Sequence, residues 1–101
     1  MIEGVKVKIG EQEYEIPALN FPRLKKVMAL QTKLVGETGE KSDQVDAMTE
    51  IIFIAVQRNY PDIKREEIED SLDMLNVNGI LDEILFVSGL KKRPTLEVEQ
   101  I

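Results

Sequence analysis

The order of the segments limits the fold of this chain more than any single residue does. Residues 4–9 alternate between apolar side chains and lysines, which is the pattern of a half-buried strand. Gly10 favours a turn, and the extended stretch after it predicts a hairpin over residues 4–16. Pro17 ends the hairpin because proline cannot donate to a strand ladder. A lone hairpin is only marginally stable in water, so we expect it to pack on the helices that follow.

Four helices are expected after the hairpin, from the spacing of apolar residues and from typical helix ends. In the first, Asn20 is the expected N-cap, and an apolar face at helical spacing contains Phe21, Leu24, Val27 and Met28. The four helices are predicted at about residues 21–35, 43–59, 64–73 and 77–87.

Polar residues and a proline set the ends of the later helices. Ser42 or Asp43 is the expected cap of the second helix, and Pro61 stops it. Asn76 or Asn78 is the expected cap of the fourth. The predicted fold class is therefore α+β, mainly α, with an N-terminal β-hairpin packed on a bundle of about four helices.

Length and charge limit the possible classes of protein. The 101 residues fit one globular domain at residues 1–90, and the sparse residues 91–101 are predicted to be a flexible C-terminal tail. Nineteen acidic and thirteen basic residues give a net charge of −6. This balance argues against nucleic acid and anionic membranes as partners, because both attract an excess of Lys and Arg. With no cysteine, no signal-like start and no long apolar run, we expect a cytoplasmic chain without disulfides.

The residue chemistry gives little support for catalysis. The chain has no histidine, so its serines lack the usual general base. The acidic residues of the helix at 64–73 are interpreted as a solvated face. Residues 76–79 resemble the middle of an EF-hand calcium loop, but Met74 and Leu85 occupy two positions where calcium needs carboxylates. We therefore predict no enzyme activity, no cofactor and no metal site.

The helix at 43–59 is apolar around most of its circumference. Ile51, Phe53 and Ile54 point well away from the face centred on Ile52. Such a helix is either wrapped by the other elements of its own domain or lies at an interface between subunits. Ile54 accordingly contacts either the hairpin or a partner.

Aromatic and C-terminal residues supply further candidate contacts. Phe86 points away from the apolar stripe of its helix, where an exposed aromatic is either incidental or an anchor for a partner. Residues 91–101 are either unstructured or dock on a neighbouring subunit through Leu96, Val98 and Ile101, adding a strand to an exposed edge. The candidate residues for partner binding or self-association are Ile54, Phe53, Tyr60, Phe86, Leu96 and Val98.

A set of short segments gives the chain a likeness to a known family. They are the hairpin with residues 14–21, the basic stretch 23–26, the helix end 58–63, the acidic stretch 66–69, the pair 72–73 and the close of the last helix at 88–90. In this layout the chain resembles the small tail assembly chaperones of tailed bacteriophages and prophages. Lys64 departs from the pattern, because a Ser or Thr helix cap is expected there.

The resemblance implies a role without catalysis. Such chaperones coat the long helical tape-measure protein before tail tube subunits polymerise around it, some self-associate, and they are absent from the mature virion. The implied partners are the tape-measure protein, the major tail tube protein and further copies of the chain, in the cytoplasm of the bacterial host. Many are made in two lengths by ribosomal frameshifting, and a slippery A-rich heptamer could encode Leu90-Lys91-Lys92.

Two other classes of protein remain open from the sequence. Another small phage morphogenesis protein, such as a neck or head–tail connector component, would stay in the finished particle. An acidic regulator or inhibitor that mimics nucleic acid needs a contiguous acidic face. Basic residues are interspersed among the acidic ones here, which argues against such a face.

Overall fold

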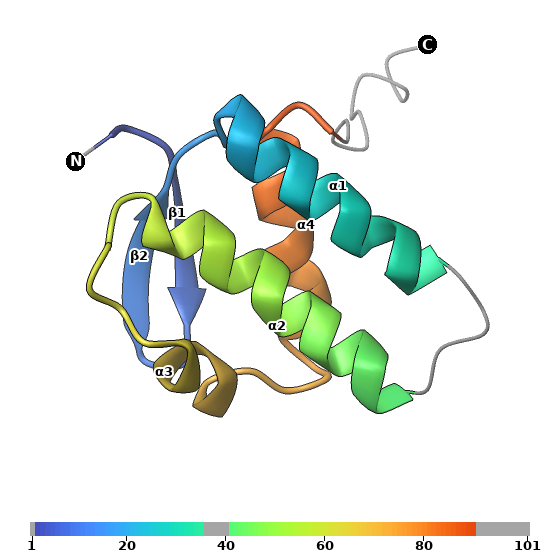
Figure 1. The fold of residues 1–101 in the computed structure, drawn as a ribbon. Helices are drawn as coiled ribbons and strands as arrows, with labels where there is room; N and C mark the ends of the chain where they lie inside the picture. Colours follow the sequence, from blue (N-terminus) through green and yellow to red (C-terminus); the bar gives the residue numbers. More distant parts are fainter. Residues whose placement is uncertain (1, 36–40, 91–101) are drawn as a thin grey trace, which may run out of the picture.

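A computed structural model of the chain describes residues 2–35 and 41–90 (Figure 1). The elements are strands β1 (Val5–Ile9) and β2 (Gln12–Ile16), then helices α1 (Phe21–Val35), α2 (Lys41–Gln57), α3 (Arg65–Asp70) and α4 (Val77–Val87). The predicted α+β class, mainly α with an N-terminal hairpin on four helices, is confirmed. Residues 91–101, predicted to be a flexible tail, lie outside the described residues.

The hairpin follows the alternation in its sequence. β1 and β2 are antiparallel, with Val5 opposite Ile16 at the open end. Val7 and Ile9 are buried, whereas Lys6 and Lys8 are exposed. The turn depends on Gly10, whose φ of 65° lies in the left-handed region that glycine adopts without steric cost.

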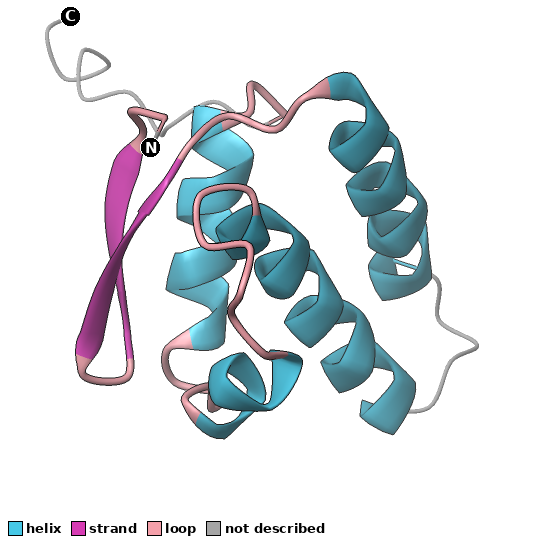
Figure 2. Cartoon of the chain, turned by 60° about the vertical axis from the view of Figure 1, so that its left-hand side comes forward, coloured by secondary structure: helices cyan, strands magenta, loops and turns pink. Residues whose placement is uncertain are grey.

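Helix α2 is the centre of the domain. It contacts α1, α3, α4 and β2, and Figure 2 shows it between α1 on one side and α4 with the hairpin on the other. Ile51, Ile52, Ala55 and Val56 are almost completely buried. The interpretation of an apolar helix wrapped by its own domain is therefore confirmed.

The apolar face predicted for α1 is partly wrong. Val27 is fully buried, but Phe21 is 78% and Met28 50% exposed. At about 100° per residue, Leu24 and Leu30 each lie about 60° from Val27, whereas Phe21 and Met28 lie about 100–120° away. Because α1 packs chiefly on α2, only the arc around Val27 is covered.

Two helix boundaries differ from the prediction. Helix α2 covers Lys41–Gln57 instead of 43–59, and α3 covers only Arg65–Asp70 instead of 64–73. Helix α3 begins without a Ser or Thr cap; Glu67 Oε1 instead accepts a hydrogen bond from Lys64 N at 2.9 Å. The Glu67 carboxylate thus satisfies the backbone N–H of the residue before the helix, which is one half of a capping box. The Lys64 side chain does not make the other capping bond, and Glu67 N donates instead to Lys64 O at 3.1 Å.

The connection between α3 and α4 explains the early end of α3. The Asn76 side chain accepts from Asp73 N at 2.9 Å and donates to Ser71 O at 3.0 Å. These bonds satisfy backbone groups outside a helix, so the chain turns after Asp70. Asn76 stands at the N-cap of α4 as predicted, but its side chain makes no capping hydrogen bond to that helix.

Candidate functional site

The structure places the candidate partner-binding residues in different environments. Ile54 is buried in the same hydrophobic cluster as the hairpin residues Val7 and Ile16, so a partner cannot reach it in this fold. Of the two interpretations of Ile54, contact with a partner and contact with the hairpin, its burial supports the contact with the hairpin. Phe53 is half-buried against that cluster. Leu96 and Val98 lie outside the described residues.

Tyr60 connects the end of α2 to the hairpin by a hydrogen bond and a ring contact. Its hydroxyl oxygen accepts a hydrogen bond from Glu15 N at 2.9 Å. Its ring meets that of Tyr14 edge-on, with centroids 5.1 Å apart and planes at 88°. Burial, and then the nearby Glu67 carboxylate and Tyr60, raise the pKa of Tyr14 above its ordinary value, so the Tyr14 phenol stays neutral near pH 7.

Arg58 and Asn59, just before Tyr60, also connect the end of α2 to the hairpin and to the residues on either side of it. The Asn59 amide donates to Ile2 O at 2.7 Å and to Glu15 O at 2.9 Å, and its oxygen accepts from Ile2 N at 2.8 Å. Arg58 donates to Ala18 O. Sequence reasoning missed this role, because the pattern marks only a helix end before Pro61 and gives no sign of the distant backbone groups.

Phe86 remains a candidate contact on α4, where it is half-buried. We expect Phe86→Ala to weaken self-association or partner binding while lowering the melting temperature only slightly, because a hot-spot aromatic acts chiefly in the complex. Thermal unfolding and sedimentation of the two proteins measure the two effects separately. A large fall in melting temperature with unchanged sedimentation would assign Phe86 to the core.

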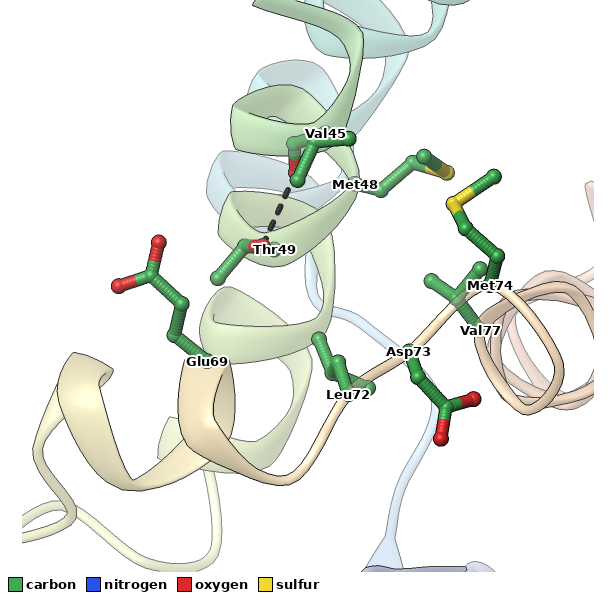
Figure 3. Close-up of a pocket in the computed structure, with 8 residues that line it drawn as sticks. All are labelled: Val45, Met48, Thr49, Glu69, Leu72, Asp73, Met74 and Val77. Atoms are coloured by element: carbon green, nitrogen blue, oxygen red, sulfur yellow. Dashed lines mark hydrogen bonds between the residues drawn. The ribbon is translucent and has the colours of Figure 1, made fainter. Parts of the chain in front are cut away.

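A groove that the sequence did not predict opens between α2 and the α3–α4 connection, and we call it the α2–α4 groove (Figure 3). Its volume is about 180 Å³. Figure 3 shows the thioether ends of Met48 and Met74 pointing toward one another. The groove is lined by Val45, Met48, Thr49, Glu69, Leu72, Asp73, Met74 and Val77.

The interior of the α2–α4 groove is apolar. The only polar side chain contributed by α2, that of Thr49, donates its hydroxyl to Val45 O at 2.9 Å and so is satisfied within the helix. Three exposed apolar side chains belong to the groove or adjoin it: Val45 is 42%, Met74 66% and Leu75 95% exposed. Apolar groups exposed together on the surface of a globular domain are typical of interaction sites.

Carboxylates surround one edge of the α2–α4 groove. Arg65 lies 2.9 Å from Glu50, 3.7 Å from Glu69 and 3.9 Å from Asp46, measured between nitrogen and carboxylate oxygen. The hydrogen bond to Glu50 is the main cause that raises the pKa of Arg65, so the guanidinium stays charged. Three carboxylates around one guanidinium leave an excess of two negative charges beside the groove.

Two further kinds of site concern the part of the chain that the structure describes: a metal centre and a membrane-spanning helix. There, no group of three or more His, Cys, Asp or Glu side chains is placed to hold a metal ion. None of the helices at residues 21–35 and 41–90 is both long and apolar enough to cross a membrane. No protein-family model, curated protein or solved structure matches this chain.

Proposed function

We propose that this chain is a non-catalytic tail assembly chaperone of a bacteriophage or prophage, which binds the tape-measure protein during tail morphogenesis. The observation that carries the proposal is the α2–α4 groove, with its exposed lining residues Val45 and Met74 and the adjoining Leu75, on a chain with a net charge of −6. The family resemblance of residues 4–90 supplies the class of partner. The groove offers a surface on which such a partner can bind.

The physical demands on such a chaperone agree with these features. A tape-measure protein is a long amphipathic helix that exposes apolar side chains until the tube closes around it. A protein that keeps it soluble needs a small apolar binding surface within an otherwise charged exterior. Many weak sites along one helix, occupied by self-associating copies, give a high total affinity. Further copies of the chain and the major tail tube protein are therefore proposed as additional partners.

The proposed place of action is the cytoplasm of the bacterial host, and the chain is absent from the mature virion. A neck or head–tail connector component is the nearest rival class, because it would also be small and would also bind other phage proteins. Mass spectrometry of purified virions separates the two. Peptides of this chain at the copy number of a structural component would favour the connector.

The DNA around the gene tests the proposal without any protein chemistry. We expect a slippery heptamer over the codons of Leu90-Lys91-Lys92, an overlapping second reading frame, and then a very long gene for a helical protein. Sequencing from codon 85 of this chain through the next two or so kilobases provides the answer. A gene without a long helical neighbour would contradict the proposed function.

A further inference from the structure

The size of the α2–α4 groove indicates what it holds. Pockets for drug-sized ligands and cofactors have volumes of about 300–1,000 Å³. At about 180 Å³ the groove is too small for such a molecule. It fits one or two apolar side chains of a larger partner, which is how anchor residues fill pockets at protein interfaces.

The walls of the groove favour a helix over an extended peptide. An extended peptide binds by adding to a sheet edge, where free backbone groups pair with its own. Here the walls are side chains of α2, α3 and α4 and of the connection between α3 and α4. The amides of Leu75 and Asn76 in that connection already donate to Asp73 Oδ1, each at 2.8 Å. A helix satisfies its own backbone, so it can cover the groove without leaving polar groups unpaired.

The charges at the margin favour a basic helix. Glu69 and Asp73 line the groove, and Figure 3 shows their carboxylates pointing away from the apolar side chains between them. Glu69 shares Arg65 with Asp46 and Glu50, so this one guanidinium offsets only part of the negative charge. A helix that brings its apolar stripe into the groove therefore places its flanking residues against carboxylates.

Methionine gives the groove tolerance for different apolar side chains. Met48 and Met74 both line it, one from α2 and one from the connection before α4. Methionine is unbranched and polarizable, and surfaces rich in it bind partners of varied shape. Such tolerance suits a partner whose successive segments differ in sequence.

We propose that the α2–α4 groove binds one face of an amphipathic helix whose apolar stripe is flanked by Lys or Arg. The inference rests on the proposed function, because it takes the partner to be a long helix with many such segments. It adds the surface that the partner covers and the sign of the charge that this surface selects.

Two synthetic helices test the selection of charge. Both are about 20 residues long, a length at which isolated helices become stable. Both carry leucines at positions i, i+3, i+4 and i+7, flanked by lysine in one and by glutamate in the other. We expect the full chain to bind the lysine-flanked helix on the order of tenfold more tightly by fluorescence anisotropy at low salt, and the ratio to shrink at about 1 M salt. Equal affinities at low salt would overturn the proposal.

Matched variants test the surface. Met74→Ala should weaken binding of the lysine-flanked helix by about tenfold, because it removes an exposed apolar wall. Met28→Ala is the control, since it makes the same change at an exposed methionine of α1 that does not line the groove. Both variants should keep the melting temperature of the natural chain. Equal losses, or no loss, in the two variants would place the binding surface elsewhere.

A charge reversal tests the carboxylate edge. Glu69→Lys should reverse part of the preference, with weaker binding of the lysine-flanked helix and stronger binding of the glutamate-flanked one. Glu3→Lys makes the same change in net charge at an exposed position outside the groove. If Glu3→Lys changed the preference as much as Glu69→Lys, overall charge and not the groove would explain the selection.

Other occupants of the groove are distinguished in the same assay. A synthetic peptide of residues 91–101 that bound more tightly than the lysine-flanked helix would show that the groove serves this chain's own C-terminal segment. Self-association lost in Met74→Ala, with helix binding intact, would show that a second copy covers it. Either result would overturn the proposal.

Co-expression distinguishes an error in the proposed binding surface from an error in the proposed function. The tape-measure protein is co-expressed with the natural chain and with Met74→Ala. If both keep it equally soluble, the function stands and the groove is the wrong surface. If neither keeps it soluble while the synthetic lysine-flanked helix still binds, the groove takes a basic helix from another protein and the chaperone function is wrong.

Discussion

We expect Ile52→Asp to remove most or all of the stability of the domain at room temperature. Ile52 is completely buried in α2, the helix that contacts α1, α3, α4 and β2. A carboxylate there has no cationic partner and loses its water, which costs more than about 4 kcal/mol. A domain of this size has a total stability of about 5–10 kcal/mol. The substitution therefore removes most or all of the free energy of unfolding.

Far-ultraviolet circular dichroism in urea measures this effect. The control is Val45→Asp, which places the same carboxylate seven residues earlier on the same helix, at a side chain that is 42% exposed. We expect Val45→Asp to keep its helical signal with a loss of about 1 kcal/mol or less. An Ile52→Asp protein with a urea midpoint close to that of the control would mean that α2 is not the centre of the core.

Asn59→Ala has the second largest expected effect, a loss of about 1.5–2.5 kcal/mol in the free energy of unfolding. The substitution removes all three hydrogen bonds by which the Asn59 side chain holds Ile2 and Glu15. Each such bond contributes about 0.5–1.5 kcal/mol, and the bonds to Ile2 are exposed and so lie at the low end. The melting temperature should fall by about 10–15 °C.

Thermal unfolding followed by circular dichroism checks the Asn59 prediction. Asn78→Ala serves as the matched control, because Asn78 is an exposed asparagine in the first turn of α4. Its melting temperature should stay within a few degrees of the natural chain. Equal shifts in melting temperature for the two variants would show that the three side-chain hydrogen bonds of Asn59 do not stabilise the domain.

The sequence predicted the elements whose periodicity is strong. The alternation of residues 4–9 reports directly which positions face a core, and the apolar spacing in 21–35 and 77–87 predicts two helices. In the first helix the spacing did not predict which apolar positions are covered, since Phe21 and Met28 are exposed.

The extent of α3 was not predictable in the same way. Asn76 and Asp73 fold the connection through side-chain to backbone bonds, and those bonds compete with the helix that local preference favours.

The candidate site could not be predicted from the sequence, because it depends on how the helices pack against one another. The helical projection placed Ile54 away from the main apolar face, but it could not distinguish a second buried contact inside the domain from an interface. The α2–α4 groove combines residues of α2, α3, α4 and the connection between the last two. Met74 contributes to it only because α3 ends at Asp70, which frees the connection to form one wall.

Co-expression with the long helical protein encoded downstream tests the chaperone function most directly. The measured quantity is the fraction of that protein in the soluble extract, with and without this chain, together with its co-elution on size-exclusion chromatography. The chaperone function predicts an insoluble partner when expressed alone and a soluble, co-eluting complex with this chain. A partner whose solubility does not change, with this chain eluting by itself, would contradict it.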